Sequence, residues 1–155
     1  KNDFYGMYMR GQRAMQYAES LDLWNGKDIT TSGGSMGAAQ SIAAAALNPK
    51  VTRCTAFIPW VADLAGKAKF KRLGGWAPEY TETLRYFDTA NLASRVKCPA
   101  EITIGLGDYI CPPSGQMILF RNLGGKKTLK IRQNMGHGRC LQPNPYEVIF
   151  NEEIR

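Results

Sequence analysis

The chain has 155 residues, a formal net charge of +7, and 44% hydrophobic against 21% charged residues. Its mean hydropathy of −0.32 excludes a membrane-embedded protein, and its apolar content excludes a disordered one. The length fits a single domain rather than an array of domains. No run approaches the roughly 18–20 apolar residues that cross a bilayer, and no signal peptide is evident. We therefore expect one globular domain that does not enter a membrane.

The predicted secondary structure alternates between helices and strands. The alanine-rich run at residues 38–47 strongly favours a helix, and residues 4–20 carry apolar side chains at helical spacing. The expected elements in chain order are a helix at 4–20, strands at 28–32, 52–58, 100–106 and 128–132, helices at 38–47 and 115–122, and a final helix from about residue 144 to the end. Ser114 is the expected cap of the helix at 115–122.

The alternation predicts an α/β fold in which helices cover both faces of a parallel sheet. Residues 60–95 break the pattern, because they contain Gly74, Gly75 and Pro78 and only short helical patches. We expect this segment to leave the core as a lid-like excursion.

Charge and cysteine patterns argue against two classes of function. The basic residues are scattered, and the clusters at 67–72 and 126–127 are short and contain a single aromatic residue, Phe70, rather than the interleaved aromatic residues of a nucleic-acid platform. The four cysteines, Cys54, Cys98, Cys111 and Cys140, form no Cys-x-x-Cys pair, which argues against zinc or thioredoxin-type chemistry. We expect no metal, no cofactor and no nucleic-acid partner. A disulfide between Cys111 and Cys140 stays open, and so does the cellular compartment.

The glycine-rich turn GGSMG at residues 33–37 lies between an expected strand and an expected helix. This Gly-x-Ser-x-Gly context is typical of a nucleophile elbow, in which a sharp turn lifts a serine hydroxyl out of the sheet. Ser35 is the candidate nucleophile. The backbone N–H of Met36, at the helix N-terminus, is the candidate oxyanion donor. The alternative is a tight strand-to-helix turn without chemistry.

His137 is the one histidine in the sequence, so any Ser–His mechanism has to use it as the base. Asp108 follows an expected strand, where the site of a parallel sheet lies. It is the candidate acid that orients the imidazole. Asp63 and Asp88 are rival acids, of which Asp63 is the more credible because it also follows a strand. The chain order Ser35, Asp108, His137 is that of α/β-hydrolases.

Several runs make the sequence resemble the acetyl xylan esterase/cephalosporin-C deacetylase family, namely GGSMG (33–37), YFDTAN (86–91), VKCP (96–99) and GLGDYICPPS (105–114). The resemblance implies an α/β-hydrolase that removes acetyl groups from sugars or xylan. It implies Ser35, Asp108 and His137 as nucleophile, acid and base, and assembly into ring-like hexamers. Met36 stands where the family usually has glutamine, which leaves the backbone N–H role intact.

The family is about twice as long as this chain, so residues 1–155 correspond to its C-terminal portion. The strand before Ser35 would then be an edge strand, and the half-sheet would expose an apolar face. We expect a homo-oligomer or a partner chain that supplies the N-terminal half, and weak activity without it. The alternatives are an inactive fragment that serves as an assembly module, or a peptidase or dienelactone-type hydrolase on the same fold.

Overall fold

A mixed five-stranded sheet forms the centre of the computed structural model, which describes residues 3–72, 74–138 and 147–152. The strands lie side by side in the order β1 (Thr30–Gly34), β2 (Arg53–Phe57), β3 (Ala100–Gly105), β4 (Lys127–Arg132) and β5 (Glu147–Glu152). Strands β1 to β4 are parallel, and β5 runs antiparallel to β4. The predicted α/β class is confirmed, and the sheet is parallel as predicted except for β5.

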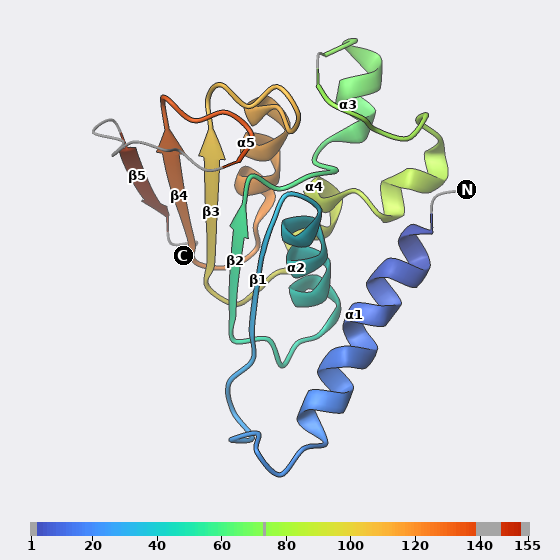
Figure 1. The fold of residues 1–155 in the computed structure, drawn as a ribbon, viewed down its shortest axis with the longest axis vertical. Coiled ribbons are helices and arrows are strands. Elements are labelled where there is room, and N and C mark those ends of the chain that lie inside the picture. The colour runs from blue at the N-terminus through green and yellow to red at the C-terminus, as the bar shows by residue number, and fades with distance from the viewer. Residues whose placement is uncertain (1–2, 73, 139–146, 153–155) are drawn as a thin grey trace.

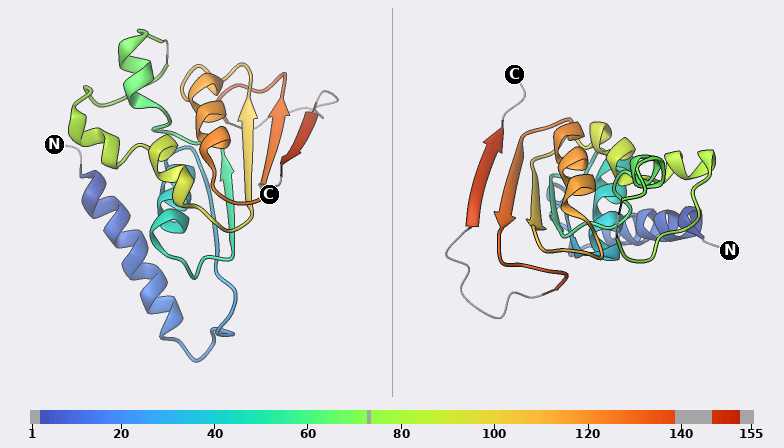
Figure 2. Two further views of the ribbon diagram at one scale, coloured as in Figure 1. Left: turned by 180° about the vertical axis from the view of Figure 1, so that it is seen from behind. Right: turned by 90° about the horizontal axis from the view of Figure 1, so that it is seen from above.

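The helices described by the structure lie on one face of this sheet (Figures 1 and 2). Strands β1 to β4 keep their chain order in space, and parallel crossovers are right-handed, so each connection returns over the same face. The expectation of helices on both faces is therefore not met within residues 3–138. The helices are α1 (Phe4–Glu19), α2 (Met36–Leu47), α3 (Leu64–Lys69), α4 (Thr89–Leu92) and α5 (Pro113–Asn122).

The hydrophobic core fills the space between the sheet and these helices. Helix α2 packs its small side chains directly against β1 and β2, and Ile42 is fully buried there. Ile102 and Ile104 of β3 and Leu129 of β4 complete the same cluster. Apolar area removed from water stabilises the fold by roughly 25 cal/mol per Å². This packing fixes the strand ends against which the candidate site is built.

The opposite sheet face is mainly polar. It carries Thr30, Ser32 and Arg53, and Lys130 of β4 forms an ion pair with Glu101 of β3 at 2.8 Å. The expected exposed apolar face is therefore wrong for this half-sheet. Strand β1 does lie at an edge of the described sheet, as predicted.

Two local predictions are wrong. Residues 147–152 form β5 instead of part of a final helix, because Val148, Ile149 and Phe150 favour a pleated strand that pairs with β4. The expected start of that helix, near residue 144, lies outside the described residues. Helix α5 begins at Pro113 without a side-chain cap. The Ser114 hydroxyl instead accepts a hydrogen bond from Arg72 at 3.3 Å.

The segment between β2 and β3 contains α3, a 3₁₀ helix η1 (Glu82–Tyr86), α4 and a second 3₁₀ helix η2 (Ala93–Arg95). Helix α3 projects beyond the end of the sheet, while α4 returns to pack on α5 (Figure 1). The lid-like role expected of residues 60–95 stays a prediction. None of the described helices has both the length and the apolar character to span a membrane.

Candidate active site

Ser35 occupies a strained turn between β1 and α2. Its φ of 53° and ψ of −116° lie where a residue with a side chain is seldom found. Three backbone hydrogen bonds hold the turn. The Ser35 N–H donates to Phe57 O at 2.9 Å, and the Ser35 carbonyl accepts from the N–H groups of Ala39 and Trp60, each at 3.2 Å. Such over-determined strain is typical of a functional turn, and it fits the predicted elbow.

Gly33 and Gly37, the two glycines of the Gly-x-Ser-x-Gly turn, differ in whether a side chain would fit. A Cβ on Gly33 would lie 2.4 Å from the carbonyl carbon and oxygen of Gly37, so α2 can cross β1 this closely only if residue 33 lacks a side chain. A Cβ on Gly37 would meet no atom within 4 Å. The close approach therefore requires Gly33, whereas the described residues leave room for a larger residue at 37.

Met36 takes the first position of α2, and its side chain is about half exposed. The first N–H groups of a helix have no partner within the helix, and the helix dipole places partial positive charge on them. Met36 directly follows Ser35, so its N–H, at the start of α2, stays the candidate oxyanion donor.

Asp108 lies just after β3 and is almost fully buried. Its Oδ1 accepts hydrogen bonds from the N–H groups of Ile110 and Cys111 at 2.9 and 2.8 Å. These two donors close the loop after β3 around the carboxylate. They also fix the direction in which its remaining lone pairs point.

His137 lies after β4, and its Nδ1 is 3.0 Å from Oδ2 and 3.1 Å from Oδ1 of Asp108. The two loops are joined by the backbone, since Gly107 donates to Met135 O at 3.0 Å. The carboxylate can thus accept a hydrogen bond from Nδ1–H, which leaves Nε2 unprotonated and available as a base. The imidazole remains partly accessible to solvent, with 24% of its side chain exposed.

The structure brings Asp108 and His137 into contact. Ser35 directly follows β1, which runs parallel with β2, β3 and β4, so the three residues lie at the same carboxyl end of the sheet. Figure 1 shows these strand ends together. Within the described part of the chain, no hydrogen bond joins the Ser35 hydroxyl to the imidazole. Catalytic hydrogen bonds are often loose in an empty site and tighten when substrate binds.

Cys111 is a site residue that the sequence argument did not assign. Its thiol is free and buried, and Sγ lies within 4.8 Å of ligand atoms of Asp108 and His137. The pKa of this thiol is raised to about 11, chiefly by burial and also by the Asp108 carboxylate, while Ser35 and Lys67 act in the opposite sense. Its spacing of three residues after Asp108 was the available signal. The possible partner Cys140 lies outside the described residues.

Asp108, Cys111 and His137 are also the donor set in the described residues that could hold a metal ion. The Asp108 carboxylate already accepts two backbone N–H groups and faces the imidazole. The pKa of the thiol is raised, so a metal ion that bound there would have to displace the thiol proton.

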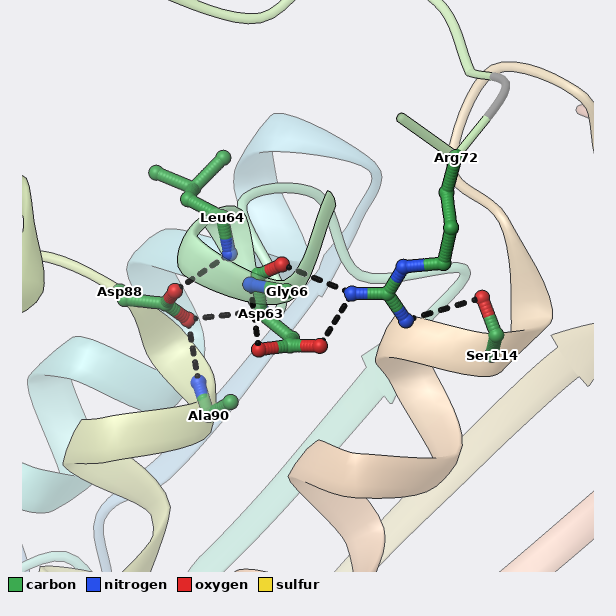
Figure 3. A network of polar contacts seen from close by, with 7 residues as sticks. All are labelled: Asp63, Leu64, Gly66, Arg72, Asp88, Ala90 and Ser114. Atoms are coloured by element: carbon green, nitrogen blue, oxygen red, sulfur yellow. Dashed lines mark hydrogen bonds and ion pairs between the residues drawn. The ribbon is translucent and has the colours of Figure 1, made fainter. Parts of the chain in front are cut away.

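The rival Asp88 is committed to backbone donors. Its carboxylate accepts from the N–H groups of Asp63, Leu64 and Ala90 (Figure 3) at 2.9, 2.6 and 2.9 Å. Burial raises the pKa of this carboxyl, while those three hydrogen bonds lower it. Asp88 ties α4 to the start of α3, which is a structural task.

The other rival, Asp63, is equally occupied. It caps α3 by accepting from Gly66 N at 3.1 Å, and it forms an ion pair with Arg72, whose guanidinium also reaches Ser114 (Figure 3). Its φ of 58° turns the chain away from the sheet. Of the three candidate acids, Asp108 is the one that contacts His137 in the described residues.

The sequence matches the acetyl xylan esterase (AXE1) family over residues 2–74 and 75–150. Acetyl esterase Axe7A of Xylanibacter ruminicola is 37% identical over 154 residues, covering 93% of this chain and 35% of that protein. The chain therefore spans about a third of the length of this curated relative.

Solved structures show the same arrangement of strands. An acetyl xylan esterase from Paenibacillus sp. R4 has a TM-score of 0.78 at 26% identity, over 86% of this chain and 47% of its own. Acetyl xylan esterase 1 from Thermoanaerobacterium sp. JW/SL YS485 has a TM-score of 0.71 at 24% identity, over 86% and 48%, and supports the fold alone. Because the two family matches together run from residue 2 to residue 150, this chain belongs to the acetyl xylan esterase family.

Proposed function

We propose that this chain carries the nucleophile, acid and base of a serine esterase that removes acetyl groups from acetylated sugars or xylan. The observation that carries the proposal is the contact between the buried Asp108 carboxylate and Nδ1 of His137, at the sheet edge where Ser35 sits in a strained turn. Family membership and the acetyl xylan esterases among its relatives support the acetylated carbohydrate as the substrate class.

In the proposed mechanism, Ser35 Oγ attacks the acetyl carbonyl while His137 Nε2 takes its proton. Asp108 keeps the Nδ1 proton in place and stabilises the imidazolium that forms. The Met36 N–H donates to the oxyanion of the tetrahedral intermediate. The imidazolium then protonates the sugar oxygen, which leaves as an alcohol. Water, deprotonated by His137, releases acetate and restores the Ser35 hydroxyl.

The test is active-site labelling of the purified chain with a fluorophosphonate, which reacts with an activated serine. We expect mass spectrometry to find the label on Ser35 and the Ser35→Ala variant to remain unlabelled. Ser32→Ala is the matched control, because Ser32 is an exposed serine of β1, three residues before Ser35. Hydrolysis of p-nitrophenyl acetate should fall by at least about 10³-fold in Ser35→Ala.

Two outcomes would contradict the proposal. Full hydrolysis by Ser35→Ala would remove Ser35 as the nucleophile. An unlabelled and inactive wild-type chain would show that residues 1–155 do not assemble a working site by themselves, as expected of an inactive fragment that serves in assembly.

A further inference from the structure

Four aromatic rings form a continuous stack beside the candidate active site. Phe87 stacks on Phe4 with ring centroids 5.9 Å apart, Phe4 stacks on Trp60 at 5.9 Å, and Trp60 stacks on Trp76 at 5.4 Å. The interplanar angles are 22°, 25° and 22° in that order. Phe4 is buried, whereas Trp76 is 64% exposed. The stack therefore begins in the core and ends on an indole ring in solvent.

Backbone and indole hydrogen bonds connect Trp60 and Trp76 to the Ser35 turn and to the loop that contains Asp108. The Trp60 N–H donates to Ser35 O at 3.2 Å, and its indole Nε1–H donates to Trp76 O at 3.1 Å. On the other side, Gly75 N–H donates to Ile110 O at 2.9 Å. Ile110 belongs to the loop that Asp108 closes. The position of the Trp76 ring is thus fixed relative to the nucleophile and the acid.

The loop that carries Trp76 can approach Ile110 closely only because residue 75 is a glycine. A Cβ on Gly75 would lie 2.9 Å from Cγ2 and 3.1 Å from Cα of Ile110. The ammonium group of Lys67 also holds the loop, by donating to Gly75 O at 2.8 Å. A tryptophan that only covered the core would not need to present most of its surface to solvent.

A hollow of about 180 Å³ opens between this aromatic stack and the start of α2. Met36, whose N–H is the proposed oxyanion donor, forms part of its wall, so the hollow adjoins the place where the acetyl carbonyl would react. A carboxylate stands at the rim, because Asp3 lines the hollow and pairs there with Arg10. The lining residues are Asp3, Phe4, Met7, Met36, Trp60 and Trp76.

We propose that Trp76, backed by Trp60, is the stacking platform for the pyranose ring that carries the acetyl group. The inference rests on the proposed function and names the part of the site that holds the sugar. One face of a pyranose presents weakly positive C–H groups, and the face of an indole ring is negative, so the two attract each other. The hydroxyl groups at the sugar edge would reach the Asp3 carboxylate or water.

The platform predicts a difference between substrates that do and do not carry a sugar. An acetyl group on a pyranose is held by the ring beneath it, whereas ethyl acetate has no ring to stack. Loss of the indole should lower kcat/KM for acetylated xylotriose relative to kcat/KM for ethyl acetate by about tenfold, which corresponds to about 1.4 kcal/mol. The KM for the sugar ester should carry most of this change.

The experiment compares the wild-type chain with Trp76→Ala, Trp76→Phe and Phe70→Ala. Phe70 is the matched control, because it is an aromatic residue 67% exposed on the segment after α3. Calorimetric titration with unacetylated xylotriose measures sugar binding without any reaction. The ratio of kcat/KM for acetylated xylotriose to kcat/KM for ethyl acetate measures how far sugar binding contributes to catalysis. We expect Trp76→Ala to lower xylotriose affinity and this ratio about tenfold each. Trp76→Phe should lose less than about threefold in each, and Phe70→Ala should match wild type.

The outcomes separate this inference from the proposed function. If hydrolysis is absent but xylotriose binds and Trp76→Ala weakens binding, the platform stands and the esterase proposal fails. Unchanged xylotriose binding in Trp76→Ala would overturn the platform, and so would a wild-type chain that binds no xylotriose. An equal loss of activity on both esters would also overturn it, because Trp76 would then act only through the Ser35 turn.

Discussion

Replacing Asp108 with asparagine separates its structural task from its chemical one. The Oδ1 atom accepts from the N–H groups of Ile110 and Cys111, and the carboxylate faces Nδ1 of His137 at 3.0 and 3.1 Å. In Asp108→Asn the amide oxygen can keep both backbone donors. The amide nitrogen then takes the place of Oδ2, the oxygen nearer to Nδ1 of His137. Because that nitrogen donates, Nδ1 has to become an acceptor, and the ring proton moves to Nε2.

This wrong tautomer removes the base. A protonated Nε2 cannot take the proton of the Ser35 hydroxyl, so kcat should fall on the order of 10⁴-fold. The fold should be affected far less, because a neutral acceptor replaces a charged one at two hydrogen bonds, at a cost of about 1 kcal/mol. Asp108→Ala, in contrast, strands the N–H groups of Ile110 and Cys111 in a buried loop. That change should cost roughly 2–5 kcal/mol.

The assay pairs kcat on p-nitrophenyl acetate with the free energy of unfolding from urea titration, for wild type, Asp108→Asn and Asp108→Ala. We expect the asparagine variant to be stable and inactive, and the alanine variant to be both unstable and inactive. Retention of a tenth or more of wild-type kcat by Asp108→Asn would refute the tautomer argument. Equal destabilisation of the two variants would refute the assignment of Oδ1 as the acceptor that closes the loop.

Two further predictions concern the fold around the site. Gly33→Ala should destabilise the chain by about 1–3 kcal/mol in urea, because its Cβ would overlap the Gly37 carbonyl, whereas Gly37→Ala should be neutral or stabilising as a helix-favouring change; similar losses in both would contradict this. Burial raises the pKa of the Cys54 and Cys111 thiols from the usual 9.0 to about 11. Between pH 9 and 11 the folded chain keeps protons that the unfolded chain loses, so the free energy of unfolding should fall as pH rises. Cys54→Ala should show a shallower fall, and an unchanged slope would contradict the assignment.

Strands β2 to β4 were predictable because their apolar runs end at clear turn signals. The predicted strand at 128–132 and the helix at 38–47 agree with β4 and α2 to within two residues. The final helix failed for a physical reason. The Asn144-Pro145 pair looked like a helix start, but Val148, Ile149 and Phe150 found a partner in β4. A preference for the pleated strand becomes decisive when an unpaired strand edge is available.

The helices lie on one face because of the order of the strands in space, which no local sequence pattern specifies. Alternating strands and helices indicate parallel pairing, but only the spatial strand order says whether successive crossovers reverse direction. Here the order from β1 to β4 never reverses. A pattern of residues along the chain is the same in both cases, so this feature was not predictable from periodicity.

The predicted site residues share a feature that can be recognised in a sequence, namely their position just after a strand. Ser35, Asp108 and His137 each follow a strand closely, and such positions meet at one edge of a parallel sheet. Cys111 and Trp76 do not share it. Trp76 reaches the site through the long segment between β2 and β3, and its place depends on the contact of Gly75 with Ile110. Tertiary contacts of this kind are fixed by packing and have no local pattern.

The choice of acid follows from strand adjacency. His137 leaves the sheet after β4, and β3 is the neighbour of β4, with Gly105 opposite Arg132 in the last register pair. Neighbouring strands lie about 4.8 Å apart, so β2 is about 10 Å from β4. Asp108 after β3 therefore leaves the sheet beside His137 and contacts its Nδ1, whereas the Asp63 carboxylate, after β2, is taken up by Gly66 and Arg72. The chain order of serine, acid and base is thus the order in which a sheet without reversals delivers its strand ends.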